Sequence, residues 1–316
     1  MPITWRPATW NDIEPCLAIQ PTNRGDGFPD VKSALKAWKQ LFDHPFFVSG
    51  VFESATPTNG HSLVGFGCGV LVTSGFADAE ISNPRPDITS RIIASLDSGS
   101  SALASWNDVA QANAGAGVDI ANLMVAWRDD ILSPQERHDL QVAIATGFTE
   151  VVAGYRMRRI LLETTTKPVT DFHRRSLEYQ VVAEFPEIGR VIHLMTKESA
   201  AILPGSLGNV IFKAARPLLR LRESDQQLLL AALKGATDTE LAAQLGLTPS
   251  AVKARWRSAF ARIEEMMPDL VDNSEDHDGR GAQKRHRVLA YVRTHMEELR
   301  PYDWQAQGKA KSARSI

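Results

Sequence analysis

Residues 221–263 read LRESDQQLLLAALKGATDTELAAQLGLTPSAVKARWRSAFARI, and this stretch contains the start and stop signals of consecutive helices. The hydroxyl of Ser224 can cap the first helix, and Gly235 can end it in the left-handed conformation. Thr237 and Glu240 are spaced as a capping box, in which each side chain accepts a hydrogen bond from the other residue's backbone amide. The sequence therefore predicts two short helices joined by a tight turn that contains glycine.

A third helix is predicted after Gly246, where Thr248 can act as the cap and Pro249 suits the first turn. Apolar residues then recur three and four positions apart, which gives this helix one buried face. They are Val252, Trp256, Ala259, Phe260 and Ile263. Two helices with a tight turn between them, followed by a helix of this kind, indicate an all-α helix-turn-helix domain whose third helix reads DNA.

The opposite face of the third helix is basic, and it carries four cations and no acidic residue before Glu264. Arginine and lysine in the major groove can donate to guanine O6 and N7, and a helix N-terminus suits a phosphate group. We therefore predict a DNA-binding surface; the alternative is a basic solvated face on an ordinary three-helix bundle. The residues expected to contact DNA are Thr248, Ser250, Lys253, Ala254, Arg255, Arg257 and Arg262.

The stretch 221–263 resembles the DNA-binding domain of the LuxR/FixJ family without a gap. The likeness rests on the opening leucine, the apolar run to Gly235, the capping box, Ala242, and the pairs Leu245-Gly246 and Val252-Lys253. The sequence departs from the family in its first helix and in the third helix, at Arg222, Ser224, Asp225, Gln227 and Trp256. A sigma-factor-type reader helix shares the same pattern.

The resemblance implies a transcriptional regulator that binds double-stranded DNA sequence-specifically, and we expect a homodimer. RNA polymerase is a further partner that such a regulator can contact. A nonspecific structural DNA-binding protein is a less favoured alternative, because the chain carries a single compact reader helix.

Residues 1–200 alternate between strand-like and helix-like segments, which predicts an α+β domain. Strands are expected at 3–8, 46–52, 63–72, 117–127, 159–164 and 191–196, and helices at 10–19, 31–42, 135–157 and 169–177. This order resembles the GNAT acyltransferase fold. The likeness rests on Ile3, Arg6-Pro7-Ala8, Asp12-Ile13, the strand–long helix–strand unit and Leu177-Glu178-Tyr179. The resemblance implies a mixed sheet with flanking helices and an acyl-CoA-dependent N-acyltransferase.

Two departures from that family indicate that the domain senses a ligand or dimerises instead of catalysing. Family enzymes hold the coenzyme A pyrophosphate with a glycine-rich loop, whereas residues 128–134 contain no glycine and include Asp129 and Asp130, which repel phosphate. The family's tyrosine acid should lie near Phe172, which has no ionisable proton. We therefore expect no cofactor; acetyl-CoA belongs to the alternative, an acyltransferase that carries a DNA-binding domain.

The chain of 316 residues is long enough for more than one domain. We predict a GNAT-like domain at 1–200, a linker at 201–220, the helix-turn-helix at 221–268, an amphipathic helix at 282–300 and a flexible tail at 301–316. Residues 1–200 hold 17 basic and 23 acidic side chains, whereas residues 201–316 hold 18 and 14. A basic C-terminal part is typical of a nucleic-acid-binding appendage.

The remaining sequence features favour a soluble cytoplasmic protein without a metal site. No apolar run is long enough to span a membrane, and the N-terminus has no signal-peptide pattern. Cys16 and Cys68 are most simply core residues, and the histidines lack metal-ligand spacing. Two features stay open: 173–175 (His-Arg-Arg) is either an anion grip or a solvated helix face, and Glu163 is either a general base or a hydrogen-bonded structural group.

Overall fold

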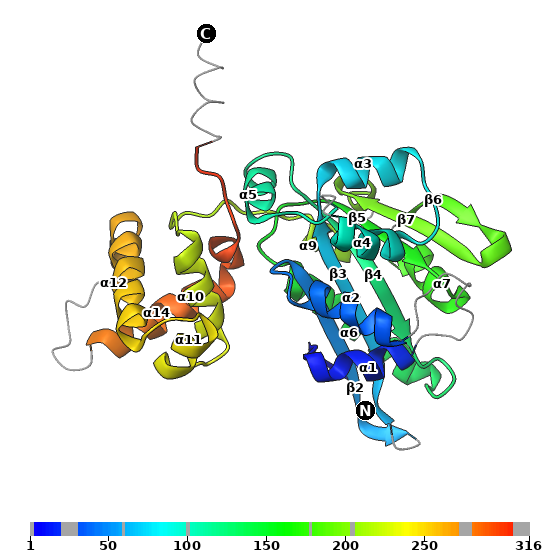
Figure 1. Cartoon of the computed structure of the whole chain (residues 1–316), viewed down its shortest axis with the longest axis horizontal. Coiled ribbons are helices and arrows are strands. Elements are labelled where there is room, and N and C mark those ends of the chain that lie inside the picture. The colour runs from blue at the N-terminus through cyan, green and yellow to red at the C-terminus, as the bar shows by residue number, and fades with distance from the viewer. Residues whose placement is uncertain are drawn as a thin grey trace, which may run out of the picture. The chain divides into compact units, whose positions relative to one another are not determined.

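The computed structural model describes residues 3–19, 31–58, 61–98, 102–176, 179–202, 206–271 and 280–305. The chain divides into two compact units. The first comprises Met1–Val109, Ala116–Val152 and Met157–Lys213, and the second Ala110–Gly115, Ala153–Arg156 and Ala214–Ile316. The passage from Lys213 to Ala214 falls within the predicted linker 201–220, part of which forms a short helix, α9 (Leu207–Ile211). Figure 1 labels the elements of both units.

A mixed sheet forms the centre of the first unit, with the strand order β1-β2-β3-β4-β5-β7-β6 among the described residues. All neighbouring strands are antiparallel except β4 and β5, which are parallel. The strands are β1 (Ile3–Pro7), β2 (Phe47–Thr58), β3 (His61–Val72), β4 (Val118–Trp127), β5 (Met157–Thr164), β6 (Gln180–Phe185) and β7 (Arg190–Thr196). The predicted mixed sheet with flanking helices is confirmed.

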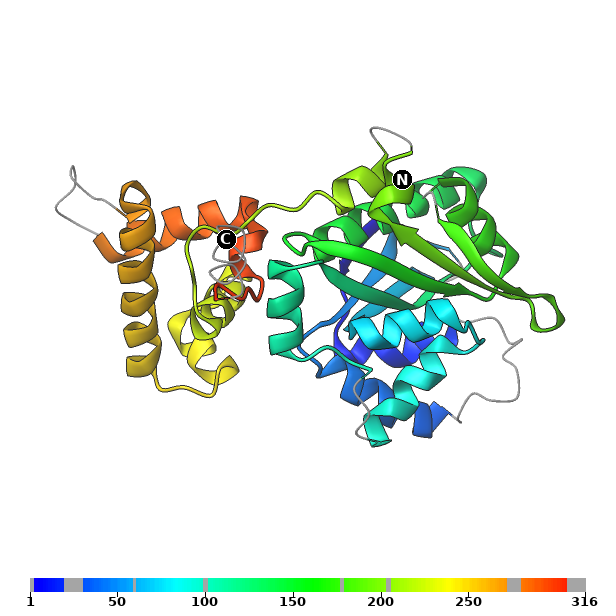
Figure 2. The same cartoon turned by 90° about the horizontal axis from the view of Figure 1, so that it is seen from above.

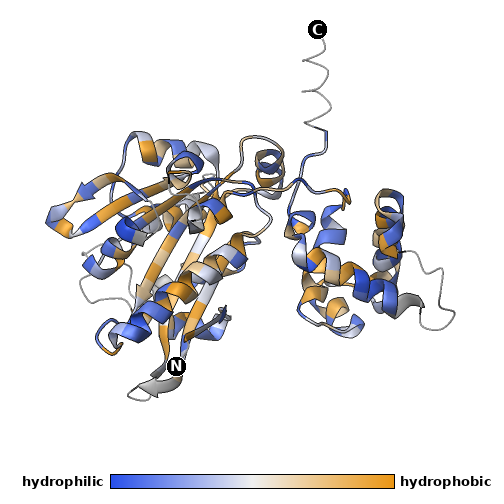
Figure 3. Cartoon of the chain, turned by 180° about the vertical axis from the view of Figure 1, so that it is seen from behind, coloured by the Kyte–Doolittle hydropathy of each residue, from blue (hydrophilic) through white to orange (hydrophobic). Residues whose placement is uncertain are grey.

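Helices pack against both faces of this sheet. One apolar cluster joins the sheet to α1 (Trp10–Ala18), α2 (Val31–Phe42), α3 (Ser74–Ser82) and α4 (Ile88–Ser98). A second cluster joins it to α6 (Pro134–Val152) and α7 (Lys167–Ser176). Figure 2 shows the first group in blue to cyan on one side of the sheet, and Figure 3 shows hydrophobic colouring along the central strands that both groups cover.

Several elements that precede residue 201 are not predicted from the sequence. Helices α3, α4 and α5 (Trp106–Ala114) form an insertion between β3 and β4, and β6 is an edge strand with a mostly exposed or half-buried pattern. The remaining short elements are η1 (Pro186–Ile188) and α8 (Lys197–Ala200). The predicted motif 177–179 lies mainly outside the described residues, which include only its last member, Tyr179.

The second unit is helical within its described residues, with α10 (Glu223–Leu233), α11 (Asp238–Gln244), α12 (Pro249–Met266), α13 (Pro268–Val271), α14 (Arg280–Thr294) and η2 (Met296–Leu299). The capping box is present, because Glu240 accepts from the backbone amide of Thr237 at 2.7 Å and Thr237 accepts from that of Glu240 at 3.3 Å. Gly235 and Gly246 end α10 and α11 with φ of +83° and +62°, as glycine permits.

The predicted cap of the first helix is wrong by two positions. Arg222 is the N-cap residue of α10, and its backbone amide donates to the carboxylate of Asp225 at 3.1 Å. An acidic side chain at the third helical position reaches back to the cap amide, which makes the Ser224 hydroxyl unnecessary there. Ser224 instead lies in the first turn of the helix.

The predicted amphipathic helix 282–300 is divided into α14, which ends at Thr294, and η2, and both belong to the same core as the helices before them. Val288, Val292 and Leu299 are fully buried in the cluster that contains Leu228, Leu229 and Val252. Glu298, buried as well, accepts from the backbone amides of Leu218 and Leu219 at 2.8 and 2.9 Å, and burial raises its pKa. The segments predicted separately as 221–268 and 282–300 therefore form one packed unit; the predicted tail is described only as far as residue 305.

Replacing Trp256 by alanine should destabilise the second unit by about 3–5 kcal/mol, the range for removing a large buried aromatic side chain. Trp256 is only 6% exposed and packs in the core of this unit. Calorimetric melting of the full chain measures the effect, and Ser258→Ala, on the exposed face of the same helix, is the matched control. An unchanged melting curve for Trp256→Ala would show that the indole belongs to the surface.

Candidate nucleic-acid interface and ligand cavity

Helix α12 exposes most of the side chains that the sequence assigns to DNA contact. Thr248, Ser250, Lys253, Ala254 and Arg257 are exposed, and Arg255 is half-buried. At the start of the helix the Thr248 hydroxyl accepts from the backbone amide of Ala251 at 3.2 Å and lies 2.9 Å from the Ser250 hydroxyl. Ser250, Lys253, Ala254 and Arg257 therefore share one exposed side near the start of the helix, and Arg255 lies at its flank.

Three cations on α12 have no charge partner. Among the described residues, Lys253, Arg255 and Arg257 make no side-chain hydrogen bond or ion pair. Lys253 and Arg257 are four positions apart and lie on the same exposed side of α12, where they leave a local positive potential because no carboxylate of the described residues pairs with them. This arrangement can attract a polyanion.

Arg262, which the sequence assigns to the DNA-contacting set, pairs with a carboxylate inside the second unit. Its Nε lies 3.3 Å from Oδ2 of Asp225, whose side chain is only 2% exposed. A buried carboxylate needs a charge partner, and Arg262 supplies it from α12 to α10. Sequence spacing could not reveal this pair, because the two residues lie on different helices.

Arg285 of α14 connects the helices that present the basic face. It donates to Asp238 of α11 at 2.7 Å and to the backbone carbonyl of Ala236 at 3.1 Å. Its guanidinium carbon also lies 4.6 Å from the ring centroid of Trp256 on α12, within the range of a cation–π contact. One side chain therefore fixes α11, α12 and α14 relative to each other.

In the first unit, a cavity lies where β4 and β5 stop pairing. Their parallel register ends at Asn122 opposite Leu162. Beyond this point β4 continues to Trp127, and a cavity of about 560 Å³ separates it from the end of β5 and the start of α7. Its lining includes Leu123, Val125, Trp127, Arg128, Asp130, Glu163 and Val169.

A β-bulge in β4 marks the same place. Cys68 of β3 pairs with Met124 and Gly69 pairs with Asn122, so Leu123 has no partner on β3. The free carbonyl of Leu123 accepts from the hydroxyl of Thr89 in α4 at 2.7 Å. The inserted helix α4 therefore satisfies a backbone group that the bulge releases, as buried carbonyl groups require.

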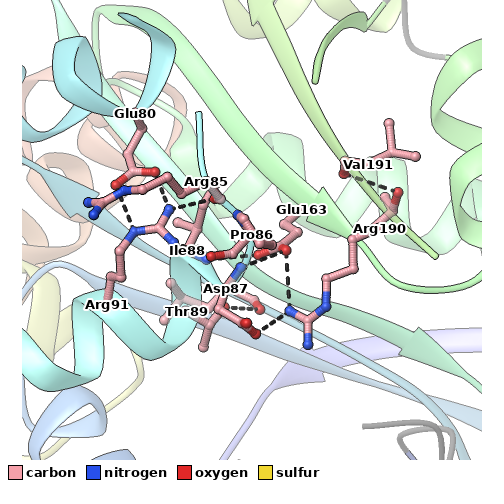
Figure 4. Close-up of polar contacts among 12 residues, drawn as sticks. Glu80, Arg85, Pro86, Asp87, Ile88, Thr89, Arg91, Glu163, Arg190 and Val191 are labelled. Carbon is pink, nitrogen blue, oxygen red and sulfur yellow. Dashed lines mark hydrogen bonds and ion pairs between the residues drawn. The ribbon is translucent and has the colours of Figure 1, made fainter. Parts of the chain in front are cut away.

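The sequence left two roles open for Glu163, general base or structural group, and the contacts of its carboxylate support the structural role. Its two oxygens accept from the backbone amides of Asp87 and Ile88 at 2.8 Å each, which caps the N-terminus of α4 from β5. Arg190 pairs with both Glu163 and Asp87, as Figure 4 shows. Asp87 adopts a left-handed conformation with φ of +69°, which these contacts hold in place. A carboxylate so fully occupied is not free to act as a general base.

A carboxylate from the first turn of α6 caps the N-terminus of that helix. Glu136 accepts from the amide and the hydroxyl of Ser133 at 2.9 and 2.6 Å, and these hydrogen bonds lower its pKa. A carboxylate thus lies at the helix N-terminus, where a phosphate would otherwise bind. Asp129 pairs with Arg137 at 2.7 Å, whereas Arg128 has no side-chain hydrogen bond or ion pair among the described residues.

The segment 173–175 divides between the interior and the surface. His173 is 2% exposed, and its Nδ1 lies 2.8 Å from the carbonyl oxygen of Val169, so the solvated reading is wrong for this residue. Burial lowers the pKa of His173 to about 3. Arg174 pairs with Glu184 at 2.6 Å, and Arg175 is exposed. The three side chains therefore do not converge on one anion.

Sequence reasoning missed a second polar cluster inside this unit. Tyr179 and Asn122 line a smaller cavity between α6 and the sheet together with His173, and His193 lies nearby, its Nε2 3.0 Å from the Thr164 hydroxyl. Burial lowers the pKa of His193 to about 4. These residues come from β4, β5, α7, β7 and the residue before β6, so no local spacing signals them.

Further sequence features can be located among the described residues. Phe172 is buried against Trp127, with ring centroids 6.0 Å apart. Cys16 and Cys68 are buried free thiols, as predicted. The described part of the chain contains no cluster of residues suited to a metal ion. None of its helices is both long and apolar enough to cross a membrane.

No protein-family model matches the chain, and no curated protein is similar to it in sequence. Solved structures with a similar arrangement include the C-terminal condensation domain of Ebony in complex with β-alanyl-dopamine, at 12% identity and a TM-score of 0.37, covering 62% of this chain and 100% of that chain. FeeM, an N-acyl amino acid synthase from uncultured soil microbes, has 11% identity and a TM-score of 0.35, with 61% and 89% covered.

A mutant form of the spermidine N-acetyltransferase SpeG from Vibrio cholerae is similar at 7% identity and a TM-score of 0.36, with 64% of this chain and 98% of that chain covered. All three TM-scores are below 0.5.

Replacing Arg262 by alanine should destabilise the second unit, because it leaves the buried carboxylate of Asp225 without its cation; we expect a loss of about 3 kcal/mol. Urea unfolding followed by circular dichroism measures this, with Arg257→Ala as the matched control. Equal stability of the two variants would mean that Arg262 does not serve Asp225.

Proposed function

We propose that the chain is a sequence-specific DNA-binding transcriptional regulator in which α12 enters the major groove. The observation that carries this proposal is the exposed side of α12 with two unpaired cations, Lys253 and Arg257; a third, the half-buried Arg255, lies at its flank. The two preceding helices end at glycines with positive φ, which gives the short turns of a helix-turn-helix. The first unit then serves as a non-catalytic domain that senses a ligand or mediates dimerisation.

The geometry of the helix assigns different tasks to its residues. Side chains in the middle of α12, Lys253 and Arg257, can reach guanine acceptors in the groove. Thr248 and Ser250 at its start can contact a phosphate, as polar groups at helix N-termini do. Sequencing of genomic fragments captured by the full chain would identify the site, and a palindrome in it would indicate a homodimer.

Replacing Lys253 or Arg257 by alanine should weaken specific DNA binding by about 1–3 kcal/mol if the side chain contacts a base, without loss of folding. Fluorescence anisotropy at fixed salt measures the affinity for the captured site. Lys234→Ala removes an exposed cation at the C-cap of α10 and is the control, which should bind like the parent chain. Parental affinity in both α12 variants would remove the basis for a reading role of this helix.

A second candidate function, an acyl-CoA-dependent N-acyltransferase, is favoured by the cavity between β4 and β5. It also agrees with the names of the acyltransferases among the similar structures. Two features of the chain oppose it: the carboxylate of Glu136 at the N-terminus of α6, and Phe172 where the family has a tyrosine acid. We therefore place it second.

Titrating acetyl-coenzyme A into the full chain should give no saturable binding in the micromolar range. The pyrophosphate would meet the carboxylates of Glu136 and Asp130 and a helix start without free glycine amides. Isothermal calorimetry measures binding, and inorganic pyrophosphate is the control ligand for the charged group alone. Micromolar affinity together with thiol release in the presence of an amine would establish the acyltransferase in place of our proposal.

A further inference from the structure

We propose that the smaller cavity of the first unit, between α6 and the sheet, binds a small uncharged molecule that carries a hydroxyl group and a short apolar part. This inference rests on the ligand-sensing role proposed for the first unit, and it does not depend on DNA binding. The site is distinct from the larger cavity at the end of the β4–β5 pairing, because Val125 is the one described residue that lines both.

Three glycines of the sheet make room for this cavity. Gly50 of β2 lies directly opposite Gly67 of β3, and Gly69 follows two positions along β3 on the same face. A Cβ on Gly67 would find its nearest atoms at 3.8 and 4.0 Å, so a side chain would fit there. Glycine weakens a strand, and inside one it often marks a place where a ligand approaches closely. The sheet therefore leaves space under α6 that side chains at these positions would fill.

The walls of the cavity are apolar, and none of the described residues that line it carries a charged side chain. Phe52 of β2 and Ile144, Phe148 and Val151 of α6 form part of these walls. A charged ligand would lose its hydration here without gaining an opposite charge, which is unfavourable in apolar surroundings. The lining therefore selects an uncharged ligand with an apolar part.

His173 of α7 supplies a hydrogen-bond acceptor at the cavity. Its Nδ1 lies 2.8 Å from the carbonyl oxygen of Val169, which can only accept, so Nδ1 carries the proton of the ring. Because burial lowers the pKa of His173 to about 3, the ring is neutral near pH 7 and its Nε2 is an acceptor. No donor among the described residues reaches Nε2. A buried acceptor without a donor is costly, so a ligand hydroxyl that donates to Nε2 is favoured here.

The neighbouring polar side chains direct the ligand to His173. Asn122 and Tyr179, which line the cavity beside it, hydrogen-bond to each other. A Cβ on Gly69 would lie 2.8 Å from Oδ1 of Asn122, so glycine at this position makes room for the amide. His193 is fully buried with its ring centroid 6.3 Å from that of His173, and its Nδ1 has no partner among the described residues. The unmet hydrogen-bonding capacity of this cluster thus lies on its imidazoles.

The volume of the cavity limits the ligand to a few non-hydrogen atoms. It measures about 60 Å³, and a buried water needs roughly 10–15 Å³ of such space. Roughly four to six water-sized groups therefore fit, which corresponds to a short alcohol. A coenzyme or a long acyl chain exceeds this space.

NMR titration of the full chain, labelled with ¹⁵N at histidine, tests the proposal with 1-butanol as the probe. Diethyl ether is an isomer of 1-butanol without a donor group, and butylammonium and butyrate test for charged ligands. Gly67→Val places a side chain in the cavity without a close contact of its Cβ. Gly75→Val, at an exposed position of α3, is the matched control. His173→Phe keeps an aromatic ring and removes Nε2.

We expect saturable binding of 1-butanol that shifts the Nε2 resonance of His173, which is identified by its absence from the spectrum of His173→Phe. Diethyl ether should bind about three- to tenfold more weakly, because it cannot donate to Nε2, and His173→Phe should weaken 1-butanol binding by a similar factor. Butylammonium and butyrate should not bind. Gly67→Val should abolish 1-butanol binding while the chain stays folded, and Gly75→Val should bind like the parent chain.

Absence of saturable 1-butanol binding, or parental affinity in Gly67→Val, overturns the proposal. Equal affinities for 1-butanol and diethyl ether overturn it as well, because the hydroxyl then has no acceptor in the cavity. If Gly67→Val does not fold, the comparison of the two isomers on the parent chain carries the test. A chain that binds 1-butanol but no DNA would keep this site and lose the proposed regulator, so the two proposals fail separately.

Discussion

The end of the β4–β5 pairing is the constraint around which the first unit is organised. At this point a bulge removes Leu123 from its partner strand, and β5 turns away after Leu162. Backbone and side-chain groups left at the opening need new partners inside a buried region. Helix α4 supplies them through Thr89 and through its own N-terminus, which is capped by Glu163. The inserted helix α4 and the cavity thus lie at the same place, where the pairing of β4 and β5 ends.

The second unit could be predicted from its sequence to the extent that its signals are local. The capping box at Thr237 and the glycines that end α10 and α11 act within a few residues, and the structure confirms them. The errors concern choices between neighbours or partners on other helices. Asp225 at the third helical position caps α10 in place of Ser224. The same buried carboxylate pairs with Arg262 of α12.

Most strands of the first unit could be predicted from the sequence, whereas its edge strand β6 and the helices inserted between β3 and β4 could not. The apolar runs of β3, β4 and β5 stand out because these strands are buried, whereas β6 is an edge strand with mixed exposure and little pattern. The inserted helices depend on long-range contacts such as Glu163 with Asp87, which are invisible to periodicity. The same holds for the interior position of His173 and for the unpaired state of Arg128, since both follow from packing of distant segments.

The burial of Glu298 and Leu299 has a consequence for biosynthesis. Glu298 binds the amides of Leu218 and Leu219, and Gln226 donates to the carbonyls of Glu298 and Arg300 at 3.0 and 2.7 Å. Translation proceeds from the N-terminus, so α12 leaves the ribosome before the residues that close its core. A nascent chain therefore carries its basic helix in an incomplete fold, and that helix acquires a fixed position only when the last helical turn has been made.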